Sequence, residues 1–498
     1  MFNINLQHLW DLLKYNPNDP LIFSTSLFLF VFVFFLMFYN LFGRNKMVRL
    51  GLLIVFSLYF YYKSAGYYAG ILVASAIVNF MFAKFIASTE NFTWKRIHLA
   101  LAVILNIGIL GYFKYTNFIM QIFAEMNNSQ FEPLSIFLPI GISFYTFKSL
   151  NYVFDVYLDN MEPTNSFRDF CVYVFFFPNL LMGPIDRAAD FLPQVRKEIY
   201  LSKEDLGKAA LLIIAGLFKK VVIADYIGLN FVDRIFDYPL RYTGVENLLA
   251  IYGYALQIYC DFSGYTDMAI GVALFLGFKL MDNFNSPFKA ASIADFWRRW
   301  HISLSKWLLD YLFKPMQFSM RTLRIWANVI ALFITFVICG LWHGGAWNFI
   351  IWGSLHGLMM SISLLLQKPK QSFYKLLRIN DTKFLRFIQT VITFHLIAVS
   401  FIIFRTNDIQ IFKDMFSQIF EFFHAEVFFQ FAEKLPIILG LMILGYALHF
   451  MPVKLENGIK KIFTSLPWFA QALVLVIVIW IAAQFKSADI TPFIYFQF

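Results

Sequence analysis

Apolar stretches of roughly 20 residues recur along this 498-residue chain, and a helix of that length crosses the hydrocarbon core of a bilayer. Backbone polar groups find no partners in lipid, so helices and closed barrels are the structures that can span it. The chain is therefore predicted to be an all-α polytopic membrane protein. The expected spans lie near residues 21–43, 48–62, 66–87, 97–123, 134–157, 209–232, 246–280, 326–348, 350–366, 384–404, 434–452 and 467–485.

The composition excludes a soluble protein. Hydrophobic residues make up 59% of the chain and charged residues only 14%, whereas about 25% of a soluble domain is charged. The net charge of +10 indicates basic cytoplasmic loops, and no nucleic-acid partner is predicted. The first twenty residues lack a basic start followed by an apolar core, so the first span is expected to remain as an anchor.

The distribution of bases orients the chain. The loop after the first expected span carries Arg44, Lys46 and Arg49, whereas the stretch from Glu125 to Glu132 carries no base. Bases concentrate in cytoplasmic loops. This pattern places the N-terminus outside and the first loop inside.

Two segments do not fit simple alternation of spans. Residues 170–185 form an apolar stretch that is broken by Pro178, Gly183 and Pro184, which predicts a segment that enters the membrane and returns. Residues 291–325 interleave charged side chains with tryptophans. This pattern predicts an amphipathic helix that lies at the cytoplasmic interface or lines a cavity walled by protein.

Two histidines are candidates for chemistry. His343 lies in GLWHGGAW beside Trp342, and His301 lies in DFWRRWHISLSKW. Ionisable side chains at membrane depth are costly, which makes them functional candidates. Imidazole suits a general base that takes a proton from a hydroxyl nucleophile, so acyl transfer from a thioester to an alcohol fits. The alternative for His343 is a helix end bounded by glycines, with tryptophans at the membrane interface.

A second polar group interrupts an apolar run at residues 257–271, where Asp261, Ser263 and Asp267 occur. Buried carboxylates need cationic partners. Either a charge-paired helix junction or a direct catalytic role is compatible with this pattern. The expected partners are Arg298, Arg299 or Lys306.

Other catalytic signatures are absent from the sequence. There is no GxSxG elbow, P-loop, HExxH motif or dinucleotide fingerprint. The three cysteines are far apart, so neither a disulfide framework nor a metal site is predicted. These absences argue against a hydrolase with its own serine, an ATP-driven pump and a metalloprotease.

Eight sequence blocks together resemble the membrane-bound O-acyltransferase (MBOAT) family. Within it they are similar to the bacterial branch of alginate O-acetyltransferases, peptidoglycan O-acetyltransferases and the D-alanyl transfer protein of teichoic acids. One departure from the family pattern is Lys148, where an uncharged polar residue is expected. The blocks are LPIGISFYTF (138–147), NLLMGPIDR (179–187), GLFKKVVIAD (216–225), YCDFSGYTDMAIG (259–271), FWRRWHISLSKWLLDYLFKP (296–315), GLWHGGAWNFIIWGSLHG (340–357), FIIFR (401–405) and FIYFQF (493–498).

The resemblance implies a ring of about 11 to 13 transmembrane helices around re-entrant or tilted central helices, with a funnel. It also implies one domain over residues 1–498, in which N-terminal helices (1–130) precede an acyltransferase core (131–366) and C-terminal helices (367–498). The expected location is the cytoplasmic (inner) membrane, with multiple passes.

The resemblance further implies residue roles. His343 matches the catalytic histidine and His301 the second histidine, while acetyl-CoA is the expected acyl donor and no cofactor is bound permanently. The phosphates of the donor are expected to meet Arg298, Arg299, Lys306, Lys314, Arg321 and Arg324. The expected polar core comprises Asp261, Ser263, Asp267, Asp295, Trp342 and Asn348.

The expected acceptor is an extracytoplasmic envelope polysaccharide, reached through a separate SGNH-hydrolase-type partner that is periplasmic or membrane-anchored. The richness in Phe, Ile, Lys and Asn indicates an AT-rich genome, which favours peptidoglycan over alginate or another exopolysaccharide. D-alanyl transfer to teichoic acid is a further alternative.

Two other classes of protein stay open from the sequence. In a transporter or flippase, Asp261, Asp267, Arg298 and His343 would form a proton relay or a substrate clamp. Transport favours symmetric halves or paired broken helices, and the hydropathy shows neither. A scaffold for the secreted partner would need the histidines only for folding.

Overall fold

The computed structural model describes residues 6–17, 19–43, 45–376, 382–485 and 493. Every regular element among these residues is helical, which confirms the all-α prediction. Arg44 lies outside the described residues, as does the FIYFQF block apart from Phe493. The chain divides into two compact units, one formed by Met1–Ile213 with Met268–Met281, the other by Ile214–Asp267 with Asp282–Phe498.

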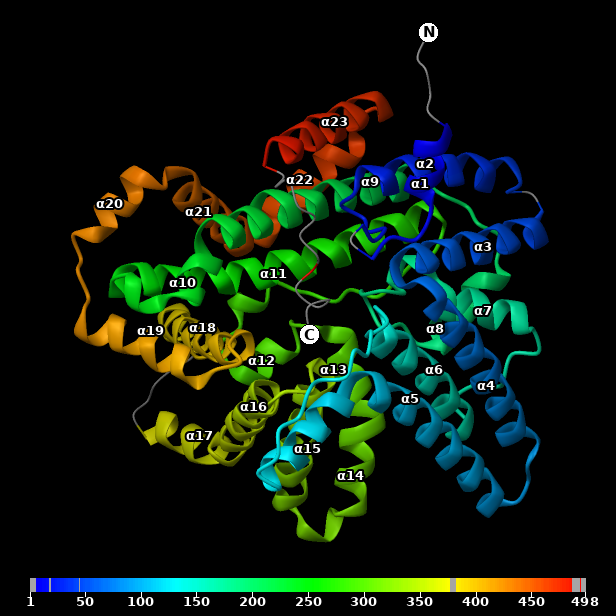
Figure 1. The fold of residues 1–498 in the computed structure, drawn as a ribbon, viewed down its shortest axis with the longest axis horizontal. Helices are drawn as coiled ribbons and strands as arrows, with labels where there is room; N and C mark the ends of the chain where they lie inside the picture. Colours follow the sequence, from blue (N-terminus) through cyan, green and yellow to red (C-terminus); the bar gives the residue numbers. More distant parts are fainter. Residues whose placement is uncertain (1–5, 18, 44, 377–381, 486–492, 494–498) are drawn as a thin grey trace. The chain divides into compact units, whose positions relative to one another are not determined.

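The first unit contains the N-terminal helices (Figure 1). A 3-10 turn, Gly66–Tyr68, joins α3 to α4, and a second one, Phe177–Asn179, follows α7. Parts of α9 and α11 continue into the second unit. The helices are α1 (Leu6–Leu13), α2 (Ser26–Leu41), α3 (Lys46–Ala65), α4 (Ala69–Ser88), α5 (Phe92–Met126), α6 (Ile142–Tyr157), α7 (Phe167–Phe175), α8 (Ala188–Arg196), α9 (Lys203–Leu217) and the end of α11 (Gly244–Phe275).

The second unit contains two π-helical segments, η3 (Phe218–Asp225) and η4 (Gly228–Val232), which follow α9. A third, η7 (Leu309–Phe313), lies between α13 and α14. The other helices are α10 (Asp233–Asp237), most of α11, α12 (Ile293–Trp297), α13 (Ile302–Leu308), α14 (Lys314–Ser319), α15 (Ile325–His343), α16 (Trp347–Leu365), α17 (Gln367–Leu376), α18 (Lys383–Arg405), α19 (Ile409–Glu421), α20 (Val427–Lys434), α21 (Pro436–Phe450), α22 (Val453–Ser465) and α23 (Trp468–Phe485), with short 3-10 turns at Pro239–Arg241, Pro287–Lys289 and Arg321–Leu323.

Six helical segments among the described residues are long and apolar enough to cross a bilayer. A seventh results if α20 and α21, which meet at 96°, form one broken span. The chain is thus a polytopic membrane protein; the expected count of 11 to 13 spans, the ring and the funnel stay predictions. The six segments are Lys46–Ser88, Phe92–Met126, Ile325–His343, Trp347–Leu365, Lys383–Arg405 and Trp468–Phe485.

The segment expected to enter and return is short and buried. Helix α7 has 9 residues, which gives it a length of about 13 Å, too short to cross a bilayer. The chain then turns through Phe177–Asn179 and through Gly183, whose φ of +130° suits glycine. Every residue from Phe170 to Asp186 is buried.

A polar network fastens this buried segment to α6. The Lys148 ammonium donates to the Asn179 side chain at 2.9 Å, and the Asn179 amide donates to Asp186 at 2.7 Å. The backbone N–H of Met281 donates to the other Asp186 oxygen at 3.0 Å. Lys148, the departure from the family pattern, therefore has a structural role in linking α6 to residues 179–186.

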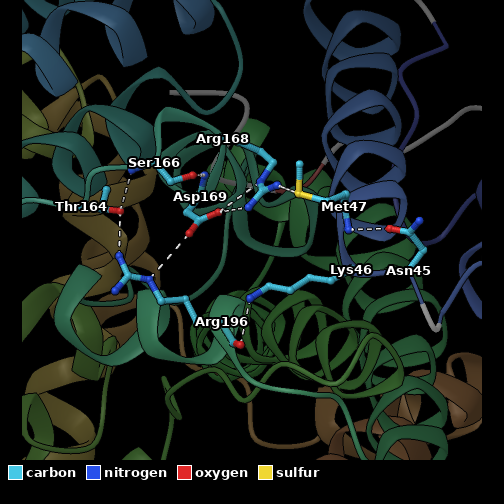
Figure 2. Close-up of polar contacts among 8 residues, drawn as sticks. All are labelled: Asn45, Lys46, Met47, Thr164, Ser166, Arg168, Asp169 and Arg196. Carbon is cyan, nitrogen blue, oxygen red and sulfur yellow. Dashed lines mark hydrogen bonds and ion pairs between the residues drawn. The ribbon is translucent and has the colours of Figure 1, made fainter.

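A second cluster ties the starts of α3 and α7 to the end of α8 (Figure 2). Asp169, which is almost fully buried, accepts a hydrogen bond from Arg168 at 2.9 Å and pairs with Arg196 at 3.7 Å. The Lys46 ammonium donates to the backbone carbonyl of Arg196 at 2.9 Å, and Arg168 also contacts the sulfur of Met47. One buried carboxylate thus holds two guanidinium groups in place.

The prediction of one amphipathic helix over residues 291–325 is wrong. The segment contains α12, then a continuous helical run of α13, η7 and α14 over residues 302–319, then the 3-10 turn Arg321–Leu323. His301 has a φ of +43° and Arg324 a φ of +54°, and such left-handed residues interrupt a right-handed helix. The alternation of charge and tryptophan therefore arises from a chain that changes direction, which places successive side chains in different surroundings.

Helices α15 and α16 pack closely because glycine faces glycine. A Cβ atom added at Gly340 would collide with the carbonyl oxygen of Phe349, and one added at Gly353 would collide with that of Phe336. Small residues at such positions let transmembrane helices approach closely, where van der Waals contact supplies the association energy.

We expect Gly353→Ala to destabilise the protein by about 1–3 kcal/mol, since the methyl group overpacks the contact between α15 and α16. The matched control is Gly440→Ala in α21, where no atom lies within 4 Å of the added Cβ. This control should be neutral or stabilising by up to about 1 kcal/mol. Thermal unfolding in detergent measures both, and equal effects would contradict the packing argument.

Candidate functional site

His343 is the last residue of α15 and is buried, with 4% of its surface exposed. Its imidazole contacts three aromatic rings edge to face, at centroid distances of 5.0 Å from Trp342, 5.3 Å from Trp352 and 5.2 Å from Phe404. These rings come from α15, α16 and α18. The histidine thus lies in an aromatic enclosure built by three membrane-spanning helices.

His301 lies between α12 and α13 and is fully buried. Its ring contacts Phe262 of α11 at 4.7 Å and Trp342 of α15 at 5.8 Å. Its Nδ1 atom lies 3.2 Å from the side-chain oxygen of Asn283. The left-handed backbone of His301 turns the chain here, so that α12 and α13 approach this residue from different directions.

Trp342 contacts the rings of both histidines, which the sequence separates widely. The second unit therefore brings together the two residues that the sequence singled out. Burial lowers the pKa of His301, which lies outside the six membrane-spanning segments, to about 3. The imidazole is thus neutral near pH 7, with one ring nitrogen that donates a hydrogen bond and one that accepts.

The two carboxylates of α11 are paired, but the expected partners were wrong. Lys220 of η3 contacts Asp261 at 2.6 Å and Asp225 at 2.7 Å, and Lys219 contacts Asp267 at 2.6 Å. Arg298 and Arg299, in contrast, pair with Asp295, four residues away or fewer. Lys219 and Lys220 lie in the π-helical segment η3, from which both side chains reach carboxylates of α11. The hydropathy of the sequence does not reveal this π-helix.

The close approach of η3 to α11 depends on Gly264. A Cβ atom there would lie 2.8 Å from the carbonyl oxygen of Gly216 and 3.2 Å from the backbone nitrogen of Lys220. The charge-paired helix junction is therefore the role that the geometry supports for Asp261 and Asp267. The other predicted core residues, Ser263 and Asn348, are buried, and the Asn348 amide donates to the carbonyl of Phe404 at 3.1 Å.

The six bases expected to meet donor phosphates lie together in the chain over residues 298–324. The structure pairs Arg298 and Arg299 with Asp295, and Lys314 with Asp310 at 2.7 Å. The guanidinium of Arg321 stacks on Phe318 at 4.6 Å. Five of the six are exposed, namely Arg298, Lys306, Lys314, Arg321 and Arg324, and Arg299 is partly exposed.

Sequence reasoning missed Asn283, which lies against His301. Asn283 was not singled out because asparagine is common in loops. His356 of α16 accepts from the indole N–H of Trp297 at 3.2 Å and lies 3.1 Å from the hydroxyl of Ser400. His449 of α21 accepts from the backbone N–H of Phe288 at 3.1 Å. His356 and His449 stand alone in apolar stretches of the sequence, and these contacts give both a structural role.

The chain is similar to known acyltransferases. The sequence profile of MBOAT, the membrane-bound O-acyltransferase family, matches residues 162–405. A peptidoglycan O-acetyltransferase of Helicobacter pylori is 35% identical over 78% of this chain and 78% of its own length. A probable alginate O-acetylase of Pseudomonas aeruginosa is 35% identical over 81% of this chain and 75% of its own length. A teichoic acid D-alanyltransferase of Bacillus subtilis is 32% identical over 53% of this chain and 68% of its own length.

We expect Lys220→Met to destabilise the protein by about 3–5 kcal/mol, because the buried carboxylate of Asp261 and the partly buried one of Asp225 lose their shared cation. The control is Lys460→Met, which removes an exposed partner of Glu456 and should change stability by about 1 kcal/mol or less. Thermal unfolding in detergent compares the two variants. A Lys220→Met protein as stable as the control would show that the buried ion pair contributes little.

Proposed function

Because this chain belongs to the membrane-bound O-acyltransferase family, we propose that it moves an acetyl group from cytoplasmic acetyl-CoA to an extracytoplasmic envelope polysaccharide. It is a multi-pass membrane acyltransferase. The donor, the direction of transfer and the location in the inner membrane belong to the proposal. The observation that carries the site assignment is the contact of Trp342 with both buried histidines.

In the proposed reaction His343 is the general base. It takes the proton of the acceptor hydroxyl as the oxygen attacks the thioester carbonyl carbon. The carbon–sulfur bond then breaks, the sulfur of CoA receives a proton, and the acetyl ester and free CoA result. His301 assists in positioning or proton transfer. Burial among aromatic rings supports this chemistry, since excluding water strengthens each hydrogen bond to the developing oxyanion.

The proposed contacts for the CoA phosphates are the bases of residues 298–324. Their exposure fits a charged ligand that arrives from water. The internal partners Asp295 and Asp310 hold three of these bases in defined positions. A phosphate would add charge-assisted hydrogen bonds to guanidinium groups that are already oriented.

Peptidoglycan is the acceptor we favour. The relatives named for peptidoglycan and alginate are equally similar at 35% identity, so identity does not choose between them. The richness of the chain in Phe, with 64 residues, and in Ile, Lys and Asn indicates an AT-rich genome, which favours peptidoglycan. We propose that a separate SGNH-hydrolase-type partner passes the group to the polysaccharide. Alginate or another exopolysaccharide, and D-alanyl transfer, are the alternative acceptor reactions.

Transport is the alternative from another class. Its proton relay would use Asp261 and Asp267, but each of these carboxylates is held by a lysine of η3. The relatives named above are transferases. Purified protein that moves a substrate across vesicles without thioester loss would support transport.

We expect His343→Ala to lower the rate of CoA release from acetyl-CoA by about 10²- to 10⁴-fold in the presence of an acceptor, because the general base is lost. The unfolding temperature of the variant should stay close to that of the wild type, so that the loss of rate does not come from unfolding. The control is His395→Ala, since His395 is exposed on α18 and should leave the rate unchanged. A His343→Ala protein that keeps the wild-type rate would remove His343 from the mechanism.

We expect deletion of this chain from its host to abolish O-acetyl groups on released muropeptides, and His343→Ala to reproduce the deletion. Mass spectrometry of the muropeptides measures the modification. Unchanged muropeptides together with loss of acetyl groups from a secreted polysaccharide would replace peptidoglycan with that polysaccharide as the acceptor.

A further inference from the structure

Asn283 lies in the segment between α11 and the turn Pro287–Lys289 and is fully buried. Its side-chain oxygen accepts from the backbone N–H of Ser303 at 3.1 Å and from the Ser303 hydroxyl at 2.9 Å. The same oxygen lies 3.2 Å from Nδ1 of His301. Its backbone carbonyl accepts from the N–H of Ile302 at 3.0 Å. Both the backbone and the side chain of Asn283 therefore contact residues 301–303.

The backbone N–H of Ser303 determines which way the Asn283 amide faces. A peptide N–H can only donate, so the side-chain atom opposite it must be the oxygen and not the amide nitrogen. The reverse orientation would bring two donors together. The observed orientation leaves the amide nitrogen of Asn283 without a partner among the described residues, which is a cost that the contacts of the oxygen must offset.

The orientation of Asn283 in turn determines the tautomer of His301. An amide oxygen accepts hydrogen bonds and donates none, so the nearby Nδ1 atom must carry the proton. Burial favours the neutral imidazole, as described above. A neutral ring that is protonated on Nδ1 has its basic lone pair on Nε2.

We propose that Asn283 is a positioning residue that holds His301 as the Nδ1-protonated tautomer and so presents Nε2 as the atom that exchanges protons or accepts hydrogen bonds. This inference rests on the proposed function for the role of His301 in catalysis. Holding the tautomer and the ring plane before the reaction removes part of the reorganisation that proton transfer would otherwise require.

Two other buried histidines of this unit, His356 and His449, show that the tautomer is set by local donors. In His356 the indole N–H of Trp297 donates to Nδ1, so the proton lies on Nε2, which faces the Ser400 hydroxyl. In His449 the backbone N–H of Phe288 donates to Nε2, so Nε2 is the acceptor. The tautomer of His301 is therefore a property of its own neighbours and not of buried histidines in general.

Uncharged residues contact His301 from three parts of the second unit. Phe262 of α11 and Trp342 of α15 contact its ring, and Asn283 and Ser303 form the polar side. Trp342 also contacts the ring of His343, which is itself titratable. A carboxylate placed at position 283 would therefore be a new charge directly at Nδ1.

The tautomer is tested by magic-angle-spinning NMR of the full chain in bilayers, with ¹⁵N-labelled histidine. The signal of His301 is assigned from its loss in His301→Gln. We expect a protonated Nδ1 and an unprotonated Nε2 at pH 7 in the wild type, and a mixture of tautomers in Asn283→Leu, which keeps the volume but removes the acceptor. An unprotonated Nδ1 in the wild type would overturn the inference, as would an unaltered His301 signal in Asn283→Leu.

The kinetic test compares Asn283→Leu with Asn283→Asp. The leucine variant should lose about tenfold or more in kcat with little change in KM for acetyl-CoA, because the proton-transfer group is misplaced while donor binding is unaffected. The aspartate variant keeps an oxygen acceptor for all three donors and should restore most of kcat. The negative charge of the aspartate raises the pKa of His301. As the pH is lowered, His301 therefore becomes protonated, and activity that needs the neutral ring is lost, at a higher pH than in the wild type.

Asn247→Asp is the matched control, since Asn247 is equally buried in the same unit and its amide donates to backbone carbonyls of residues 239–243. It should reduce stability without moving the pH profile. A pH profile that moves equally in both variants would overturn the positioning role. A tautomer that changes in Asn283→Leu while kcat does not would support the role of Asn283 and remove His301 from the proposed reaction.

Discussion

The packing of the second unit depends on buried ion pairs, because a charge in a low-dielectric interior needs an oppositely charged partner from the same chain. Lys220 lies almost fully buried between Asp261 and Asp225, with both contacts shorter than 2.8 Å. Desolvation of such groups costs several kcal/mol each, and only close geometry offsets it. The π-helical turns of η3 and the absence of a side chain at Gly264 allow this geometry, because they bring the lysines and α11 within reach.

The same rule explains the arrangement around the histidines. His301 has a left-handed backbone where the chain between α12 and α13 changes direction, and the side-chain oxygen of Asn283 accepts from Ser303 and lies beside Nδ1 of His301. Trp342 fills the space beside His301 and His343, which keeps both imidazoles away from water. Dry surroundings strengthen each remaining hydrogen bond, and this makes an orienting residue such as Asn283 consequential.

Much of this organisation could be predicted. Apolar runs indicated the spans because helix length in a bilayer is set by its thickness. The rarity of polar residues in those runs marked Asp261, Asp267 and His343 as candidates, and the block of charged residues and tryptophans around His301 marked that histidine. The partners of the carboxylates were mispredicted, since Lys219 and Lys220 looked like bases at the edge of a span. The single amphipathic helix over residues 291–325 was also mispredicted, because charge periodicity does not show where φ becomes positive.

The sequence by itself determined the class of protein and the helical content and named two candidate histidines, since these follow from composition, run length and residue chemistry. Only the tertiary structure decided which groups meet. The pairing of Lys220 with Asp261, the shared contact of both histidines with Trp342, and the orientation of Asn283 against Ser303 are long-range events. They depend on how helices pack and on which atoms of a side chain face a donor, and neither property is periodic along the chain.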